Sequence, residues 1–503
     1  MASVTYSIQY NGNTPYVVAV ECHSSNGLPN TTIVGMTNKA VDESKERLRA
    51  AFASSGLQFP KKRLTINLAP ADVPKSGTGF DCAIALSILQ TAGIVPVQKN
   101  AMVFGELGLD GSIKGVRGIV GNIIAARDAG YDTCIVPMQN KAQALLVPNV
   151  RIIAVDTLQQ LVQHFTTQSL AITDTQNGVY TPRTTDQHNA PDVADVIGQE
   201  RAKRALLIAA AGGHNILLNG PPGMGKSMLA KTLIGILPSL QHEEALHITH
   251  IHSLGSNDIT DPVYTRPFRS PHHSASDIAV VGGGQNPRPG EITLAHGGVL
   301  FLDELPEFKR STIEALRQPL EDGVITVARA KQTVTYPAQF MLIATRNPCP
   351  CGYYGSTHEC TCSPATLAAY NKKISGPIAD RIDIYLTVDS VDHKNLLHTS
   401  NTKQSPDLQK TVQRVRDTQS KRYKTAGATN ARASTQAIKN QLKLDPTAKQ
   451  LLDTAAERLQ LSPRVYIKTV KIAQTIADID QSDTIQTQHI SEALQYRPLA
   501  TQY

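Results

Sequence analysis

Residues 215–237 read NILLNGPPGMGKSMLAKTLIGIL: an apolar run, a glycine-rich turn and a second apolar run with helical spacing. The pattern G-x-x-x-x-G-K-S between a strand and a helix is typical of a phosphate-binding loop. Its glycines let backbone N–H groups close around an anionic phosphate, and the helix N-terminus adds its dipole. We expect a nucleoside triphosphate to bind at Gly220, Pro221, Pro222, Gly223, Met224, Gly225, Lys226 and Ser227. Lys226 would reach the β and γ phosphates, and the Ser227 hydroxyl would coordinate Mg²⁺.

A second apolar run, Val299 to Leu302, ends in two acidic residues. Open α/β sheets bind ligands at the carboxyl ends of their strands, so this run delivers Asp303 and Glu304 to the edge where the phosphates are expected. Asp303 suits coordination of Mg²⁺, and Glu304 is placed to orient or deprotonate an attacking water. The two strands and their loops together predict hydrolysis of ATP, with Mg²⁺ as the second cofactor.

The chain has 503 residues, a length that predicts about three domains. Polar stretches at 166–191 and around 392–405 divide it. Residues 1–165 predict a mixed α/β domain and residues 166–191 a linker. Residues 192–391 alternate short apolar strands with helical segments, which predicts a parallel sheet covered on both faces, and residues 392–503 predict a helical C-terminal domain. The overall fold class is α/β.

The first residues, MASVTYSIQY, lack a basic segment followed by an apolar run, and no stretch of about 18 consecutive apolar residues occurs in the chain. We therefore expect a soluble, cytoplasmic protein with no membrane partner. The formal net charge of +7 is mild for this length. It permits nucleic acid as a partner without requiring it.

Four of the seven cysteines lie in the segment NPCPCGYYGSTHECTCSP, residues 347–364. In a reducing compartment such clusters are more often metal ligands than disulfides. The two C-x-C pairs predict a four-thiolate Zn²⁺ site at Cys349, Cys351, Cys360 and Cys362, with His358 as a substitute ligand. A reduced cluster without metal and a redox pair remain the alternatives. The adjacent His272 and His273 indicate packing or hydrogen bonding rather than a second metal site.

The middle block resembles the AAA+ ATPases. Its segment QFMLIATRN fits their sensor strand, which makes Asn347 the sensor residue. GPIADRIDIYL resembles the segment that carries the arginine acting on a neighbouring subunit's ATP, which points to Arg381, and LSPRVYIKTVKIA matches the second sensor at Arg464. The resemblance implies a ring, a homo-hexamer. A salt bridge to Asp380 or Asp383 is the alternative role for Arg381.

Residues 266–308, RPFRSPHHSASDIAVVGGGQNPRPGEITLAHGGVLFLDELPEF, resemble the magnesium-chelatase-like subgroup more closely, and within it the ComM/YifB family. The N-terminal block and the C-terminal helices match the same family, so the likeness covers nearly the whole chain. One departure is Arg346, which stands where methionine is expected before Asn347. This arginine would alter the charge of the pocket.

The N-terminal block also resembles the proteolytic domain of Lon proteases, which use a Ser–Lys dyad. The alignment places Gly79 at the serine position and Val120 at the lysine position. Neither residue has a nucleophile or a base, so the dyad chemistry is lost. Ser76 and Lys75 are adjacent, and side chains at neighbouring positions generally point apart. We expect an inactive domain that serves as a platform for assembly or for partners.

Two basic segments are candidates for DNA contact. The stretch ITVARAKQTVTYPAQF reads as a hairpin whose tip carries Arg329 and Lys331, and it resembles the DNA-contacting hairpins of related helicases. Residues 403–432 hold eight basic residues against two acidic ones, with Tyr423 among them. A solvated turn and a solvated linker helix are the respective alternatives.

The family resemblance implies an ATP-driven hexameric DNA motor. Its helicase and branch-migration activity would promote recombination of incoming single-stranded DNA during natural transformation, with single-stranded and branched DNA as substrates and recombination proteins as candidate partners. Two rivals remain: a magnesium-chelatase-type motor that acts on a partner chelatase, and a nucleotide-switched scaffold without motor activity.

Overall fold

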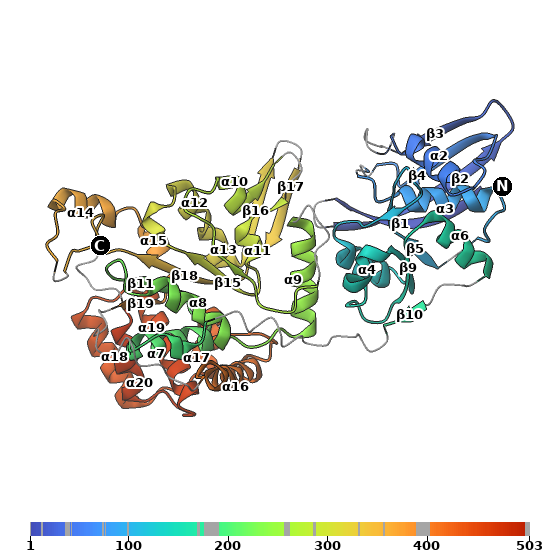
Figure 1. The fold of residues 1–503 in the computed structure, drawn as a ribbon. Helices are drawn as coiled ribbons and strands as arrows, with labels where there is room; N and C mark the ends of the chain where they lie inside the picture. The colour runs from blue at the N-terminus through green and yellow to red at the C-terminus, as the bar shows by residue number, and fades with distance from the viewer. Residues whose placement is uncertain are drawn as a thin grey trace. The chain divides into compact units, whose positions relative to one another are not determined.

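The computed structural model describes residues 2–11, 14–35, 41, 43–72, 75, 77–97, 100–167, 172–175, 191–255, 262–284, 288–329, 332–355, 358–388 and 403–497. The chain folds into two compact units (Figure 1). Unit 1 comprises Met1–Pro182, Gln241–Tyr264 and Ala328–Thr335, and unit 2 comprises Arg183–Leu240, Thr265–Val327 and Tyr336–Tyr503. A search of the described residues found no helix with the length and apolar character needed to cross a membrane.

Unit 1 is built on a mixed sheet of eight strands in the order β10-β9-β8-β5-β1-β2-β4-β3. The pairs β1–β5, β5–β8, β8–β9 and β3–β4 are parallel, whereas β2 pairs antiparallel with both β1 and β4, and β10 pairs antiparallel with β9. The strands span β1 Ala2–Asn11, β2 Thr14–Ser25, β3 Asn30–Val34, β4 Arg63–Ala69, β5 Ala101–Val103, β8 Thr133–Pro137, β9 Arg151–Val155 and β10 Ile172–Asp174. A separate small hairpin pairs β6, Glu106–Leu107, with β7, Ile113–Lys114.

Helices cover both faces of this sheet. Successive strand residues point to opposite faces, so Ile135 of β8 packs in one core with helix α3, while its neighbour Cys134 packs in another core with helix α4. Helix α3 is apolar nearly all round and is buried along almost its whole length, as expected for a helix inside a core. The helices of unit 1 are α2 Ser44–Ser54, α3 Asp81–Thr91, α4 Ile119–Asp128, α5 Lys141–Ala144, α6 Leu158–Thr167 and α9 His242–Gly255.

Unit 2 is built on a sheet of five strands in the order β12-β15-β18-β11-β19, and all four strand pairs are parallel. The strands span β11 Ile216–Asn219, β12 Phe268–Arg269, β15 Val299–Leu302, β18 Met341–Arg346 and β19 Ile384–Thr387. Strands β15 and β18 are buried at every position, which fits a sheet covered on both faces. The predicted parallel sheet and the α/β fold class are therefore confirmed.

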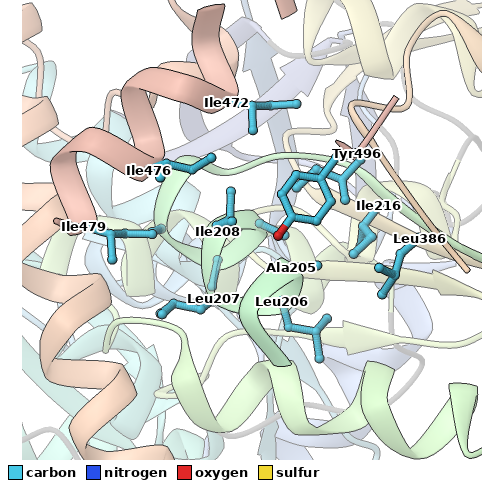
Figure 2. Close-up of a cluster of buried hydrophobic side chains, with 14 of the residues drawn as sticks. Ala205, Leu206, Leu207, Ile208, Ile216, Leu386, Ile472, Ile476, Ile479 and Tyr496 are labelled. Carbon is cyan, nitrogen blue, oxygen red and sulfur yellow. The ribbon is translucent and has the colours of Figure 1, made fainter. Parts of the chain in front are cut away.

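Helices from three parts of the chain cover one face of this sheet (Figure 1). Helix α7, Glu200–Gly212, and helix α8, Lys226–Ile236, lie there with the C-terminal helices. Figure 2 shows residues of α7 meeting Ile472, Ile476 and Ile479 of helix α19, together with Tyr496. The C-terminal helices are α16 Ser405–Tyr423, α17 Thr435–Gln441, α18 Pro446–Arg458, α19 Pro463–Ile479 and α20 Thr487–Gln495. The predicted helical character of this region is confirmed.

Short elements connect the strands of unit 2. They are the helices α10 Asp277–Val281, α11 Glu291–Leu294, α12 Arg310–Ala315, α13 Arg317–Asp322, α14 Pro364–Asn371 and α15 Gly376–Ala379. Strands β13, Gly282–Gly283, and β14, Arg288–Pro289, form one small hairpin. The predicted hairpin before the sensor strand is present as the two-stranded sheet of β16, Val324–Arg329, and β17, Gln332–Pro337.

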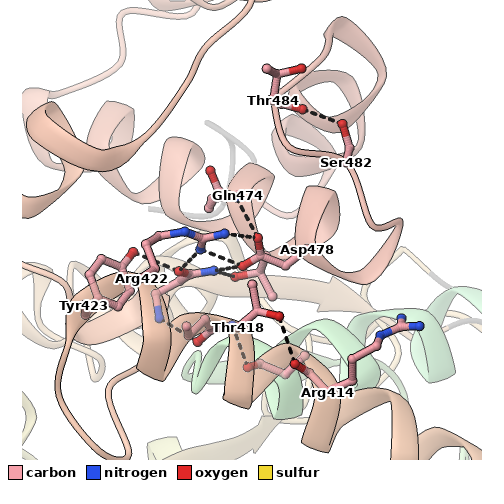
Figure 3. A network of polar contacts seen from close by, with 12 residues as sticks. Arg414, Thr418, Arg422, Tyr423, Gln474, Asp478, Ser482 and Thr484 are labelled. Atoms are coloured by element: carbon pink, nitrogen blue, oxygen red, sulfur yellow. Dashed lines mark hydrogen bonds and ion pairs between the residues drawn. The ribbon is translucent and has the colours of Figure 1, made fainter.

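A buried carboxylate ties α16 to α19 (Figure 3). Asp478 accepts hydrogen bonds from Arg422 at 2.9 Å, from Gln474 at 2.7 Å and from Asn430 at 2.9 Å. Several donors on one buried acid satisfy the charge that burial would otherwise penalise. The network fixes the C-terminal helices against one another.

Helices α4 and α9 approach closely in unit 1. Two glycines, one just before α4 and one within it, leave room for the side chains of α9. A Cβ atom on Gly121 would lie 2.3 Å from Cε1 of His250, and one on Gly118 would lie 3.0 Å from Cδ2 of Leu254. Burial lowers the pKa of His250 to about 4, so the imidazole is neutral where it meets α4. Residues 242–255 of the middle block therefore form part of the core of unit 1.

We expect Gly121→Ala to destabilise the protein by about 1–3 kcal/mol, because the buried imidazole of His250 blocks the new methyl group. Helix propensity alone predicts the opposite sign, a gain of about 1 kcal/mol. Urea unfolding of Gly121→Ala, His250→Ala and the double variant measures the difference. In the His250→Ala background, Gly121→Ala should become neutral or stabilising. An equal loss of stability in both backgrounds would contradict the contact.

Candidate functional site

Three neighbouring parallel strands of unit 2 end at the same edge of the sheet. Strand β11 leads into the glycine-rich loop, β15 leads into Asp303, and β18 leads into Asn347. The register pairs Leu218 of β11 with Thr345 of β18, and Leu302 of β15 with Ala344 of β18. Carboxyl ends of adjacent parallel strands meet at one edge. The sheet therefore gathers the polar residues that the sequence places after each strand.

Lys226 is buried, with only 8% of its surface exposed. Its ammonium group donates to the carbonyl oxygens of Gly220 at 2.6 Å and Pro221 at 2.7 Å, and to Oδ1 of Asn347 at 3.1 Å. Burial lowers the pKa of Lys226, and the nearby Asp303 and Glu304 carboxylates act in the opposite direction. The cation is thus held between the glycine-rich loop and the end of β18, at the edge where phosphates are expected.

The Ser227 hydroxyl and the Asp303 carboxylate are in direct contact. Ser227 Oγ donates to Asp303 Oδ2 at 2.9 Å. A hydroxyl and a carboxylate this close are the ligand types that Mg²⁺ takes beside a nucleotide. The structure therefore fits Mg²⁺ at the two residues expected to bind it.

Glu304 follows Asp303 at the same carboxyl edge of the sheet. Its backbone has a left-handed conformation, with φ of 53°, which is uncommon for a residue with a side chain and is enriched at functional sites. The amide of Asn347 donates to Glu304 Oε1 at 3.4 Å. Asn347 therefore contacts both Lys226 and Glu304.

Thr345 joins the two acidic residues, and the sequence analysis did not identify it. Its hydroxyl donates to Asp303 Oδ1 at 2.5 Å and accepts from the backbone N–H of Glu304 at 2.8 Å. A threonine directly after the apolar run MLIA of a buried strand was the available signal. Gln199 was also missed. Its side chain donates to the carbonyl oxygen of Met224 in the glycine-rich loop at 2.9 Å.

Arg346 does not face this site. It follows Thr345 in β18, so its side chain points to the other face of the sheet. The guanidinium is 4% exposed and donates to Oδ1 of Asn371 in α14 at 2.8 Å. The extra positive charge is therefore directed to α14 rather than to Asp303.

Arg381 and Arg464 lie together, away from the glycine-rich loop of their own chain. Arg381 forms an ion pair with Glu321, and Arg464 approaches the same carboxylate at 3.8 Å. Arg381 comes just before β19, so it lies at the amino-terminal edge of the sheet, whereas Lys226 lies at the carboxyl edge. Four strand residues separate the edges by about 13 Å. Among the described residues, Arg381 forms neither of the alternative salt bridges, to Asp380 or to Asp383, and Asp383 pairs with Lys468 at 3.4 Å.

A cavity of about 720 Å³ lies beside these arginines and not at the phosphate loop. Its lining is largely apolar, comes from α14, α15, the start of β19 and α19, and includes Ser375, Lys468 and Arg497. None of the glycine-rich loop, Asp303, Glu304 or Asn347 is among the lining residues. The chemistry of the carboxyl edge, and not the size of a cavity, identifies the candidate nucleotide site.

The four cysteines of residues 349–362 come together. Their Sγ atoms all lie within 4.8 Å of one another. Cys360 lies 3.7 Å from Cys349 and 3.6 Å from Cys351, and a tetrahedral site with metal–sulfur distances of about 2.3 Å requires sulfur–sulfur distances of about 3.8 Å. The thiols of the group do not shift together: the backbone N–H of Tyr353 and the thiol of Cys349 lower the pKa of Cys351 to about 6, whereas burial and the neighbouring thiols raise the pKa of Cys360 to about 12.

No histidine joins the cysteine group among the residues the structure describes. His358 contacts the ring of Tyr353, with the ring centroids 5.2 Å apart. His272 and His273 stack on each other at 4.1 Å, and His272 Nδ1 lies 2.7 Å from the hydroxyl of Ser274. This arrangement agrees with the packing and hydrogen-bonding role predicted for the two histidines.

The Lon-like positions of unit 1 carry no catalytic groups. Gly79 accepts a backbone hydrogen bond from Gly105 at 3.2 Å, and Val120 is fully buried in an apolar core. The ammonium of Lys75 is buried and donates to the carbonyl oxygen of Pro70. Ser76 lies outside the described residues.

The candidate DNA contacts fall largely beyond what the structure describes. Lys331 and the side chain of Arg329 are outside the described residues. In the basic segment 403–432, three arginines bond within the protein instead: Arg416 to the carbonyl of Ala210 at 2.7 Å, Arg414 to that of Ile479 at 3.1 Å, and Arg422 to Asp478. These three side chains serve packing of α16.

We expect Thr345→Val to lower ATP turnover about ten- to a hundredfold, equivalent to about 1.4–2.7 kcal/mol. Valine keeps the shape of threonine but leaves Asp303 and the N–H of Glu304 without their partner. Steady-state hydrolysis and nucleotide affinity measure the effect. Thr345→Ser retains the hydroxyl and is the matched control. If Thr345→Ser loses as much turnover as Thr345→Val, the hydroxyl is not the group that matters.

Comparison with protein families shows where this site belongs. Residues 192–396 match the family described as magnesium chelatase, subunit ChlI, residues 20–140 match subunit ChlI of Mg-chelatase, and residues 402–497 match the C-terminal part of the same subunit. Part of the chain also aligns with Lon protease 2 of Herpetosiphon aurantiacus, at 26% identity over 171 residues, 32% of this chain and 21% of that protein.

Full-length relatives are similar over nearly the whole chain. Competence protein ComM of Haemophilus influenzae is 40% identical over 501 residues, 99% of this chain and 97% of that protein. The uncharacterized protein YifB of Escherichia coli is 41% identical over 491 residues, 96% of this chain and 94% of that protein. With its Lon-like N-terminal region, its parallel sheet and its phosphate-loop edge, the chain belongs to the ComM/YifB family of magnesium-chelatase-like AAA+ proteins.

Proposed function

We propose that this protein is an ATP-driven, ring-forming DNA motor of the ComM kind. The family implies ATPase activity. The observation that carries the proposal is the convergence of Lys226, Ser227, Asp303, Glu304 and Asn347 at one edge of the parallel sheet. The arrangement fits binding of ATP with Mg²⁺ and attack by water on the terminal phosphate.

Each residue at the edge has a distinct role in this proposal. Lys226 exchanges its loop carbonyl partners for the β and γ phosphates, and Ser227 and Asp303 hold Mg²⁺. Glu304 orients or deprotonates the attacking water, and Asn347 senses the terminal phosphate. The backbone N–H groups of residues 220–227 enclose the phosphates, because Gly223 and Gly225 adopt the left-handed conformation that turns the loop, with φ of 80° and 74°.

Assembly of a homo-hexamer completes the site. Arg381 and Arg464 share one surface at the opposite edge of the sheet from Lys226, which supports a role on the ATP of a neighbouring subunit. An arginine supplied by a neighbour stabilises the charge that develops on the transferred phosphoryl group. Hydrolysis then depends on the ring.

DNA is the proposed substrate. Similarity to competence protein ComM over nearly the whole chain supports helicase and branch-migration activity on single-stranded and branched DNA during natural transformation, with recombination proteins as partners. Arg329 and Lys331 at the hairpin tip are the proposed phosphate contacts. The family models named for magnesium chelatase favour one rival, a motor that acts on a partner chelatase.

Zinc is the proposed metal of the cysteine group. Four thiolates at near-tetrahedral separations suit Zn²⁺, which strengthens such loops by cross-linking them. In this role the ion would be structural, because four protein ligands leave no open position for a substrate.

Displacement of a labelled strand from a three-strand DNA junction tests the motor. Wild type is expected to displace the strand only with ATP, and Glu304→Gln should lose displacement while it still binds ATP and assembles, because the glutamine cannot act as a base. Lys331→Ala should weaken displacement but leave basal ATP hydrolysis unchanged. Competent hydrolysis that neither displaces DNA nor responds to it would favour the chelatase-type rival. Unchanged function in Glu304→Gln would favour the scaffold.

Mixing two inactive variants tests whether Arg381 acts on a neighbour. Alone, Arg381→Ala should lose about a thousandfold in ATP turnover, and Glu304→Gln should be inactive. In an equal random mixture, about one quarter of the sites combine an intact Glu304 with a neighbour's intact Arg381, so activity should return in proportion. Mixed rings, verified by pull-down of one tagged variant with the other, that remain inactive would contradict the model.

A further inference from the structure

The cysteine knuckle, residues 349–362, contacts the glycine-rich loop directly. Gly352 is buried, with φ of 88°, and a Cβ atom placed on it would lie 2.7 Å from Cδ and 3.1 Å from Cγ of Pro222. Pro222 stands inside the loop that spans residues 220–227. The backbone of the knuckle therefore packs against the phosphate loop with no room for a methyl group between them.

A second connection runs through the residue that leaves the sensor strand. Asn347 precedes Cys349 by two positions, accepts from the ammonium of Lys226 at 3.1 Å and donates to Glu304 at 3.4 Å. Any shift of Cys349 along the chain direction thus displaces a side chain that touches the lysine and the acidic residue of the site.

Cys349 links the two connections. It is fully buried, its carbonyl accepts from the N–H of Gly352 at 3.0 Å, and its sulfur accepts from the N–H of Tyr354 at 3.3 Å. The cysteine is thus fixed to the turn that carries Gly352 on one side and to Asn347 on the other. Its sulfur is also one of the four that gather at the cluster.

We propose that metal bound at the four cysteines positions the phosphate loop, so that metal occupancy sets the affinity of the protein for nucleotide. The ion cross-links the two ends of the knuckle and holds Gly352 against Pro222 and Asn347 against Lys226. Without it, the cross-link between Cys351 and Cys360 is lost, and the conformational freedom that the knuckle gains competes with its packing on the phosphate loop. The inference rests on the proposed zinc and ATP sites.

Gly352 and Gly355 offer a matched pair of variants. Both have left-handed backbones, with φ of 88° and 76°, so alanine introduces similar backbone strain at either position. At Gly355 a Cβ atom meets nothing within 4 Å, whereas at Gly352 it meets Pro222. The difference between the two variants therefore isolates the contact with the phosphate loop.

The first experiment measures the dissociation constant of a fluorescent ATP analogue, with zinc content and melting temperature recorded on the same full-length samples. Gly352→Ala is expected to weaken nucleotide binding about tenfold or more relative to Gly355→Ala, at equal zinc content. An equal fall of the melting temperature in both variants would reflect the backbone strain that alanine introduces at either position. Equal nucleotide affinity in the two variants overturns the positioning role of Gly352.

The second experiment removes zinc from the wild-type protein with a zinc-selective chelator in the presence of excess Mg²⁺. Nucleotide affinity should fall as zinc is lost and return when zinc is added back. Absence of zinc from the purified protein, with no uptake from solution, would overturn the metal proposal, and failure of wild type to bind the analogue would overturn the ATP proposal. If both bind but zinc removal leaves nucleotide affinity unchanged, the coupling itself is wrong.

Discussion

A buried ammonium must be surrounded by oxygen atoms. In unit 2 the buried ammonium is that of Lys226, and several segments of the site supply its oxygen partners. Taking an unpartnered charge out of water is costly, so the lysine draws the carbonyls of its own loop and the amide of Asn347 toward one point. The strand order follows from the same need, because β11 and β18 must be neighbours for the loop and the sensor residue to share that ammonium. Asn347 also donates to Glu304, and it precedes Cys349 of the cysteine knuckle by two positions, so it connects Lys226 to both.

Sequence alone could predict the sites whose residues lie close together along the chain. The strand, loop and helix around Gly220 to Ser227 follow from local patterns, as do the acidic pair after β15 and the gathering of four cysteines within fourteen residues. Contacts between distant segments were not predictable. Thr345 reads as one more strand residue until Asp303 is placed beside it. Arg381 pairs with Glu321, sixty positions away in the chain, while the nearby Asp383 pairs with Lys468.

In unit 1, the two positions predicted to correspond to the Lon-type dyad are Gly79 and Val120. Neither has a catalytic group, and Val120 packs in the apolar core. A lysine at position 120 would place its ammonium among Ile119, Ile123 and other buried apolar side chains, where nothing balances the charge. Valine stabilises that core instead. Gly121, next in the chain, leaves room for His250 of α9, so α4 serves as a packing surface for a segment of the middle block. The contact of α4 with α9 thus holds residues 242–255 within unit 1.

In the proposed ring, the placement of the two arginines leaves the site of a single chain incomplete. Phosphate ligands gather at the carboxyl edge of the sheet, and Arg381 and Arg464 lie at the amino edge, paired with a carboxylate of Glu321 that is about half exposed. Burial lowers the pKa of Arg381, and the neighbouring positive charge of Arg464 lowers it further, so the pair of arginines favours an additional anion at this surface. An exposed partner such as Glu321 contributes only about 0–1 kcal/mol. A triphosphate carries more negative charge than this one carboxylate. In the proposed ring, a triphosphate presented by a neighbour would therefore displace Glu321 at small cost and complete the site.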